Sequence, residues 1–277
     1  MTVLTFTIIM FFGAYSAGFV GSLTGLGGGV IIIPLLTVLL GVDIHYAIGT
    51  ALVSVIATSS GSAAAYVKEG ITNMRLGMFL EIATTAGAVA GALLASVAPT
   101  HFIAILFGCT LIFSAINSLR KKEEHNVKTS SSLATILKLP NSYPTSIGMM
   151  PYGTKNVIGG FSMMGLAGVL SGLLGIGSGA FKVIAMDNIM KIPFKVSTTT
   201  SNFMMGVTAT ASAVIYLQKG YIEPGICMPV VIGVLLGAMT GAKILVKANP
   251  KKLRMFFAVI IIGLALNMIY NGIVGNI

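Results

Sequence analysis

The chain is a succession of apolar segments, and no other feature constrains its fold as strongly. Most of these segments approach or exceed the roughly 20 residues that an α-helix needs to cross a bilayer. Only 9% of the residues are charged, against about 25% in a typical soluble domain. The pattern predicts an all-α polytopic membrane protein without a sizeable soluble domain. The expected segments are 2–24, 29–41, 44–67, 72–98 and 101–119, followed by 156–174, 179–190, 195–218, 222–247 and 252–275.

A glycine-rich motif occurs twice, and the second copy follows the first at a shift of 150 residues. The first copy, GSLTGLGGGVIIIPLL, spans 21–36, and the second, SGLLGIGSGAFKVI, spans 171–184. The same shift aligns the first group of apolar segments with the second group. We therefore expect a first transmembrane repeat at 1–119, a cytoplasmic linker loop at 120–155 and a second repeat at 156–277, which together form one transport domain.

Each predicted repeat has five segments, and an odd number would insert the two repeats in opposite orientations. The cations agree with such an inverted repeat, because cytoplasmic loops of membrane proteins are rich in Lys and Arg. With 120–155 in the cytoplasm and both termini outside, Lys219 is the cation assigned to an outer loop. Fourteen of the 17 Lys and Arg residues then lie inside: Lys68, Arg75, Arg120, Lys121, Lys122, Lys128, Lys138, Lys155, Lys191, Lys195, Lys247, Lys251, Lys252 and Arg254.

The second segment of each repeat is too short to cross the membrane, at about 19 Å of α-helix. A half-helix that begins inside the membrane presents a partially positive N-terminus with free N–H groups, and two such ends form the anion sites of inverted-repeat transporters. Close packing of helices is the alternative role for the glycines, and it is the role we expect for Gly87 and Gly91. The expected site residues are Gly25, Gly27, Gly28, Gly29, Gly175, Gly177, Ser178 and Gly179.

Polar residues recur along the third segment of each repeat. Thr50 and Ser54 lie in the first repeat, and Thr200 and Asn202 lie in the second. Hydroxyl and amide groups donate hydrogen bonds to anionic oxygens without adding a fixed charge, so we expect these four residues to line the anion site. Contacts between helices explain the small hydroxyl residues equally well.

Ionisable residues inside apolar segments are functional candidates by default. Lys182 lies one turn into the second short segment, where it would attract an anion; snorkelling to the outer surface is the alternative. Glu81 has no evident partner in the sequence, so it either relays a proton or hydrogen-bonds another helix. Asp187 is a second candidate for proton coupling, although Lys191 four residues later also suits a structural ion pair.

The two glycine motifs, together with IGTALVSV at 48–55 and STTTSNFMMGVTATASA at 197–213, resemble the sulfite exporter TauE/SafE family over nearly the whole chain. The resemblance implies a transporter of the prokaryotic cytoplasmic (inner) membrane that carries sulfur-containing anions, such as sulfite, sulfonates including sulfoacetate, or thiosulfate. The chain departs from the family pattern at Ser178, where the second motif often has Gly, and at Ile184, which corresponds to Pro34.

We therefore expect a secondary transporter of a small sulfur-containing anion, and not an enzyme. An anion channel that uses the same helix ends is the first alternative. A membrane-embedded enzyme is a weaker one, because the sequence shows no clustered acid pair and its three histidines lie near segment ends or in loops. We expect no cofactor, no metal ion and no nucleic acid, since topology explains the cations. Membrane lipid is the expected surrounding partner, and a homo-oligomer is left open.

Overall fold

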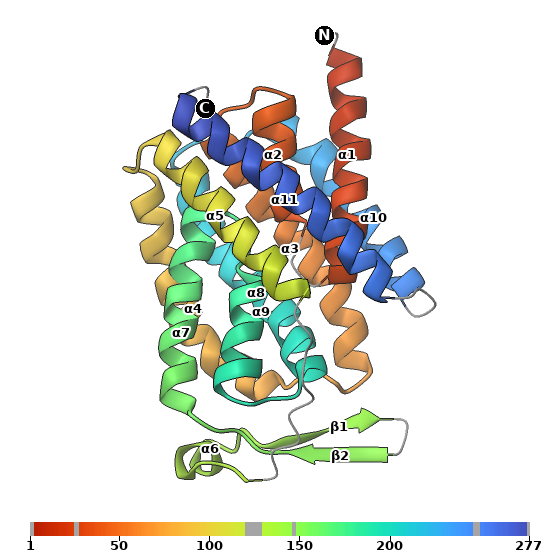
Figure 1. Ribbon diagram of the computed structural model, residues 1–277, viewed down its shortest axis with the longest axis vertical. Helices are drawn as coiled ribbons and strands as arrows, with labels where there is room; N and C mark the ends of the chain where they lie inside the picture. Colours follow the sequence, from red (N-terminus) through yellow and green to blue (C-terminus); the bar gives the residue numbers. More distant parts are fainter. Residues whose placement is uncertain (1–2, 25–27, 120–128, 146–147, 246–249, 276–277) are drawn as a thin grey trace.

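The computed structural model describes residues 3–24, 28–119, 129–145, 148–245 and 250–275 (Figure 1). The apolar segments form helices whose bounds lie close to the expected ones. In chain order these are α1 (Val3–Thr24), α2 (Gly29–Pro34) continued by the π-helical η1 (Leu35–Leu39), α3 (Ile44–Lys68), α4 (Met74–Ala95), α5 (Thr100–Leu119), α7 (Val157–Leu174), α8 (Gly179–Ile184) continued by the π-helical η2 (Ala185–Ile189), α9 (Phe194–Gln218), α10 (Pro224–Leu245) and α11 (Pro250–Val274).

Within the described ranges, six helices are long and apolar enough to cross a membrane, namely α1, α3, α4, α5, α7 and α10. Their outer faces carry exposed apolar side chains, for example Phe12, Ile82 and Met228. Such a surface is unfavourable in water and suits contact with lipid acyl chains. The expectation of a helical, polytopic membrane protein is therefore confirmed.

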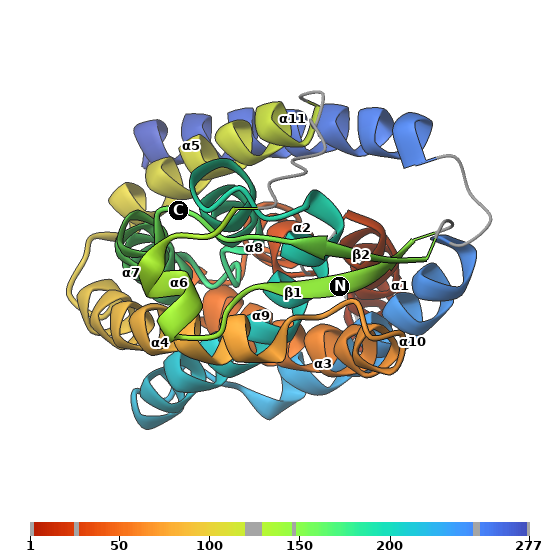
Figure 2. The same ribbon diagram turned by 90° about the horizontal axis from the view of Figure 1, so that it is seen from below.

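The segment between α5 and α7 departs from the expected loop. Its described part holds a short helix, α6 (Ser132–Ile136), and an antiparallel hairpin of β1 (Asn141–Thr145) and β2 (Gly148–Tyr152). The hairpin lies across the lower end of the helices (Figures 1 and 2). The all-α expectation is thus wrong for this segment, because pairing between the two strands and burial of Tyr152 against the helices stabilise strands that their mixed polar sequence does not reveal.

The long helices pack in pairs that join the two halves of the sequence: α1 with α10, α4 with α7, α3 with α9 and α5 with α11. Glycines on both helices allow α4 and α7 to approach closely. A methyl group added to Gly91 would lie 2.1 Å from the carbonyl oxygen of Val169, and one on Gly172 would lie 2.0 Å from that of Ala88. The packing role expected for Gly87 and Gly91 is confirmed, since both lie against the backbone of α7.

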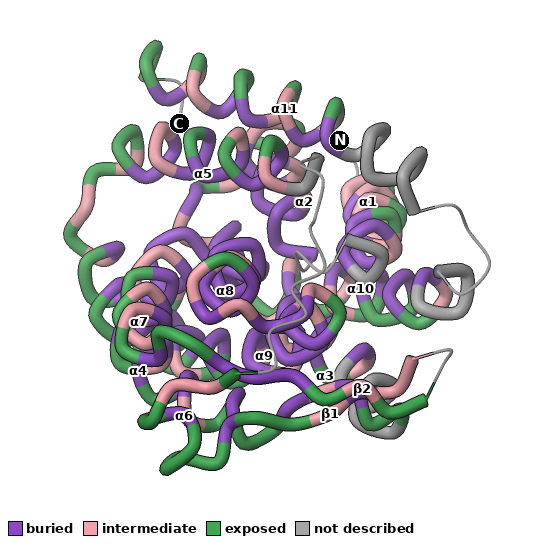
Figure 3. Tube along the Cα trace, turned by 60° about the horizontal axis from the view of Figure 1, so that its bottom comes forward, coloured by how far each residue is buried: buried purple, intermediate pink, exposed green. Residues whose placement is uncertain are grey.

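The short helices α2 and α8 lie inside this arrangement of longer helices. Every residue of α8 from Gly179 to Val183 is buried, and the tube of α8 is largely of the buried class in Figure 3. Residues of α2 join the largest buried apolar cluster together with residues of α3, α5 and α10. The fold thus places both segments that follow a glycine motif in the protein interior.

Candidate functional site

The two glycine motifs meet in the interior, against α3. A methyl group on Gly29 would lie 2.9 Å from the carbonyl oxygen of Gly175 and 3.2 Å from Val55 Cγ2. Gly177 has a φ of +67°, and a methyl group there would lie 3.0 Å from Val55 Cγ1. Glycine is required at these positions because no side chain fits between the two chain segments.

Part of the first motif cannot be placed. The expected site residues Gly25 and Gly27 lie outside the described residues. Gly28 is described and buried, and a methyl group on it would lie 3.5 Å from Thr58 Oγ1. The first motif therefore faces α3 through Thr58 and Val55, and the structure adds Thr58 to the residues near the glycines.

A small, partly open cavity lies beside the start of α8. It is mostly apolar, but two buried serines line it, Ser178 before α8 and Ser114 on α5. Neither hydroxyl has a hydrogen-bond partner among the described residues. Buried polar groups nearly always have a hydrogen-bond partner. Two such hydroxyls at one cavity therefore indicate a place where a polar molecule can bind. Sequence reasoning selected Ser178 and missed Ser114, because a serine in an apolar helix is usually a packing residue.

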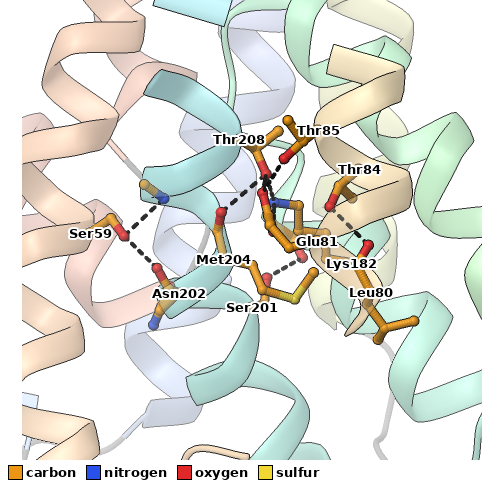
Figure 4. Close-up of polar contacts among 12 residues, drawn as sticks. Ser59, Leu80, Glu81, Thr84, Thr85, Lys182, Ser201, Asn202, Met204 and Thr208 are labelled. Carbon is orange, nitrogen blue, oxygen red and sulfur yellow. Dashed lines mark hydrogen bonds and ion pairs between the residues drawn. The ribbon is translucent and has the colours of Figure 1, made fainter. Parts of the chain in front are cut away.

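A buried polar cluster occupies the space between α8, α9 and α4 (Figure 4). The Lys182 side chain is fully buried, and its Nζ donates a hydrogen bond to Thr208 Oγ1 at 2.5 Å. The same Nζ lies 3.9 Å from Glu81 Oε2. Thr208 Oγ1 donates to Glu81 Oε1 at 2.5 Å, and Thr85 Oγ1 donates to the same oxygen at 3.2 Å. Snorkelling of Lys182 to the outer surface is therefore excluded. Glu81, which has no evident partner in the sequence, contacts Lys182 on α8 and Thr208 on α9.

This ion pair has no counterpart in the other half of the chain. The shift of 150 residues places Ile32 at the position of Lys182 and Val231 at that of Glu81. Both charges must leave water, which costs several kcal/mol per ion unless each is paired and hydrogen-bonded. A pair of this kind adds little stability compared with apolar side chains, so its presence in one half alone favours a role beyond packing.

The α9 face that turns toward α8 carries Ser201, Met205 and Thr208. Ser201 Oγ donates to the carbonyl oxygen of Gly179 at 3.2 Å, and Met205 would contact a side chain at Gly177. Sequence reasoning missed Ser201, and it overlooked Thr208 as a partner of Lys182. The helical spacing of four and three residues could have marked this face, but only the packing shows that it meets α8.

The other predicted lining residues lie elsewhere. Thr50 Oγ1 lies 3.4 Å from Cys227 Sγ on α10, and Ser54 donates to the Thr50 carbonyl oxygen within α3. The Thr200 hydroxyl accepts a hydrogen bond from the backbone N–H of Asn73, at the start of α4. The structure thus uses these three hydroxyls in helix contacts, away from the cavity beside α8.

The two remaining candidates, Asn202 and Asp187, are both buried. The Asn202 carbonyl oxygen accepts a hydrogen bond from Ser59 on α3 at 2.5 Å, while its side-chain amide makes no hydrogen bond within the described residues. Asp187 is 1% exposed and lies in η2, one π-helical turn beyond Lys182. Neither residue belongs to the cluster around Lys182.

A bundle of apolar helices that encloses a buried ion pair and a cavity lined by hydroxyls is the architecture of a polytopic membrane transporter. The chain belongs to the sulfite exporter TauE/SafE family, whose model matches residues 10–268. No solved structure matches the chain.

Curated relatives of the chain are also named as probable membrane transporters. A probable membrane transporter protein of Bacillus subtilis, YunE, is 27% identical over 98% of this chain and 99% of its own. A second from the same organism, YdhB, is 30% identical over 85% and 87%. An archaeal probable membrane transporter protein, MJ0441 of Methanocaldococcus jannaschii, is 26% identical over 89% of both chains. The family and the names of these relatives indicate membrane transport.

Proposed function

We propose that the protein is a secondary transporter of small sulfur-containing anions, such as sulfite, thiosulfate or sulfonates like sulfoacetate, and that it binds the anion beside α8. The single observation that carries the proposal is Lys182, a fully buried cation between apolar helices. A buried ammonium group attracts an anion far more strongly than one in water, because little solvent screens it. The sulfur chemistry of the substrate comes from the family, which is that of the sulfite exporters TauE/SafE.

Neutral donors near Lys182 support binding of an oxyanion. Ser178 and Ser114 line the cavity beside α8, and their hydroxyls have no hydrogen-bond partner among the described residues. Ser178 lies four residues, or about 6 Å of helix rise, before Lys182. A hydroxyl donates a hydrogen bond to an anionic oxygen without adding charge. The bare backbone at Gly179, which lines this cavity, allows close approach of such a ligand. Charge attraction from Lys182 and hydrogen bonds from these groups together suit a small anion with several oxygens.

The packing of the helices supports two inverted repeats of five membrane segments. In each pair, a helix of one half contacts a helix of the other half. The first segment of each half packs against the fourth segment of the other half (α1 with α10, α7 with α4). The two third segments (α3 with α9) and the two fifth segments (α5 with α11) pack against each other. A two-fold relation between the halves produces this pattern. In Figure 1, α1 begins at the upper end and α7 begins at the lower end. We infer that α2 and α8 are half-helices of a transporter that exposes its site alternately to the two sides.

The orientation and the membrane are part of the same proposal. We place the end that carries the hairpin in the cytoplasm, both termini outside, and the protein in a prokaryotic inner membrane. The cation count in the sequence supports this orientation.

The first test is binding to the purified protein. Thermal-shift titrations with sulfite, thiosulfate, sulfoacetate, taurine and sulfate should identify an anion that raises the melting temperature in a saturable manner. Lys182→Met should remove most of that shift, whereas Lys219→Met, which neutralises an exposed cation at the end of α9, should leave it unchanged. If none of these anions binds the wild-type protein, the proposal is wrong.

The second test concerns the glycine motif. Gly177→Val should abolish anion binding while the protein still reaches the membrane, because a side chain at this position would meet Val55 and Met205 at a positive φ and displace the motif. Reconstituted vesicles then separate a transporter from a channel. Saturable flux at modest turnover is expected of the proposed transporter, and large electrogenic currents that do not saturate would assign an anion channel.

A further inference from the structure

Lys182 already has a counterion, and this fact bears on how an anion could bind it. The Glu81 carboxylate lies 3.9 Å from Lys182 Nζ and connects to it through the Thr208 hydroxyl. Glu81 Oε2 is buried and accepts no hydrogen bond from the described residues. One oxygen of the carboxylate is thus held by two threonines, while the other faces Lys182 without a hydrogen bond of its own.

An anion that approaches Lys182 would meet a second negative charge in Glu81. Two negative charges around one cation repel each other strongly when little water separates them. A proton on Glu81 removes that repulsion and leaves Lys182 free to pair with the anion. The proton that enters with the anion cancels one unit of the negative charge that the anion brings to the site.

We propose that Glu81 is the proton-coupling residue of the transport cycle: the substrate anion replaces its carboxylate as the counterion of Lys182, and Glu81 takes up one proton from water. This inference rests on the proposed function and names its coupling ion. No covalent step is involved, since the proton moves between solvent and one carboxylate oxygen. Anion and proton then cross the membrane together.

The hydrogen bonds around Thr208 are suited to both protonation states. Its hydroxyl donates to the ionised Glu81, and the Met204 carbonyl oxygen lies 3.0 Å away as an alternative acceptor. When Glu81 carries a proton, its own O–H donates to Thr208 Oγ1, and the threonine hydrogen turns to Met204. A hydroxyl oxygen has two acceptor sites, so Thr208 also keeps its bond from Lys182. Thr208 is therefore a positioning residue for the proton on Glu81.

Few other charged groups face Glu81. On α4 itself, Arg75 is exposed near the helix start. The packed helix α7 contains no Asp, Glu, Lys, Arg or His, and α9 carries Lys195 in its first turn. The continuation of α8 carries Asp187, and α5 carries His101 at its start. Among the described residues, Lys182 is the one ion-pair partner of Glu81, so the charge of Glu81 should follow what happens at Lys182.

The experiment counts protons on binding. Calorimetric titrations of the purified full-length protein in two buffers of different ionisation enthalpy give the protons taken up per anion. Thiosulfate is the probe, because it stays fully ionised between about pH 6 and about pH 8, so that any proton taken up on binding goes to the protein. The wild-type protein should take up close to one proton per thiosulfate. Its dissociation constant should rise about tenfold per pH unit, by linkage of the two equilibria.

Variants locate the proton. Glu81→Gln should bind thiosulfate without proton uptake and with little dependence on pH, whereas Glu81→Asp should restore both. Asp187→Asn, which alters another buried carboxyl group, should behave like the wild-type protein. Thiosulfate binding to the wild-type protein without proton uptake would overturn the inference and leave the proposed function standing, and so would proton uptake lost in Asp187→Asn but kept in Glu81→Gln. Failure of all anions to bind would instead refute the proposed function itself.

Discussion

A lysine with no exposed surface persists in an apolar interior only when its neighbours compensate its charge. Lys182 meets that condition through Thr208 and Glu81, which belong to two other helices. Removing one member of such a pair commonly costs about 3–5 kcal/mol, because the other charge stays buried alone. The cluster of Lys182, Thr208 and Glu81 therefore stabilises the protein less than apolar side chains at the same positions would.

Ser178 shows the same compromise in its backbone. Its φ of 47° lies in the left-handed region, which costs a residue with a side chain roughly 1–2 kcal/mol. Its buried hydroxyl also lacks a partner among the described residues. Both features destabilise the free protein, and a bound anion would satisfy the hydroxyl.

The first prediction follows from this compromise. Ser178→Gly should raise the melting temperature of the anion-free protein, since glycine relieves about 1 kcal/mol of backbone strain, and it should weaken anion binding at the same time. Ser114→Ala is the matched control, because it removes the other cavity hydroxyl without a change in the backbone. It should weaken binding with little gain in stability. Thermal-shift assays with and without anion measure both effects, and unchanged affinity in both variants would remove the cavity from the site.

At the scale of elements, the hairpin is fastened to the helices by Asn73, the residue before α4. The Asn73 side chain accepts from the N–H of Leu76 and donates to the Leu139 carbonyl oxygen and to Tyr152 Oη, the latter at 2.8 Å. Burial raises the pKa of the Tyr152 phenol to about 12, and the bond from Asn73 acts in the opposite direction. Tyr152 of the hairpin is thus hydrogen-bonded directly to Asn73, the N-cap residue of α4.

The second prediction concerns this attachment. The pKa of Tyr152 is raised on folding, so its contribution to stability is complete below the unfolded value near pH 10 and is lost by about pH 12, a change of about 2–3 kcal/mol. Tyr152→Phe should cost about 1 kcal/mol at neutral pH, and the difference from the wild-type protein should shrink above about pH 10. Unfolding measured over this pH range checks the sign; a difference that grows with pH would contradict the buried, neutral phenol.

The third prediction concerns the helix pairs. Gly172→Val should destabilise the protein by several kcal/mol, because even a methyl group there would lie 2.0 Å from a backbone oxygen of α4, and backbone cannot move as a side chain can. Gly263→Ala in α11 is the control, since a methyl group there meets nothing within 4 Å. It should be neutral or stabilise by up to about 1 kcal/mol. Equal melting temperatures for the two variants would show that α4 and α7 do not pack this closely.

At the scale of the whole molecule, the two ends differ in character. The lower end carries the hairpin, α6 and several basic residues, such as Lys138, Lys155 and Lys195. The upper end carries both termini and the connection between α4 and α5 (Figure 1). The end that carries the hairpin and these cations is the end that we propose to lie in the cytoplasm.

The fourth prediction tests that assignment with single cysteines introduced in a background that carries Cys109→Ala and Cys227→Ala. Ile136→Cys on α6 and Val97→Cys after α4 are both well exposed, at 74% and 79%. A membrane-impermeant thiol reagent added to intact cells should label Val97→Cys, and it should label Ile136→Cys only after the cells are opened. Labelling of both positions from outside would refute the inverted arrangement, and the reverse pattern would invert the orientation.

Hydropathy and segment length along the chain are enough to predict the secondary structure of the apolar segments and the class of protein. Hydrophobicity and length are local properties, so α1 to α5 and α7 to α11 begin and end near the expected residues. The packing role of Gly87 and Gly91 was also local in origin, because small residues spaced along one face allow close contact. The hairpin escaped prediction, since its strands depend on partners outside their own sequence.

Only the tertiary structure decided which polar residues share a site. Glu81 and Lys182 come from distant parts of the chain, and nothing along the sequence pairs them; the packing of α4 and α8 against α9 does. The same packing turns Thr50 toward α10 and Thr200 toward Asn73, although their residue types suited the site. It also brings Ser114 to the cavity beside Ser178. The sequence of a helix determines the spacing of its side chains. The neighbouring helices determine which of its faces packs against which helix, because all the apolar surfaces of the protein are buried together.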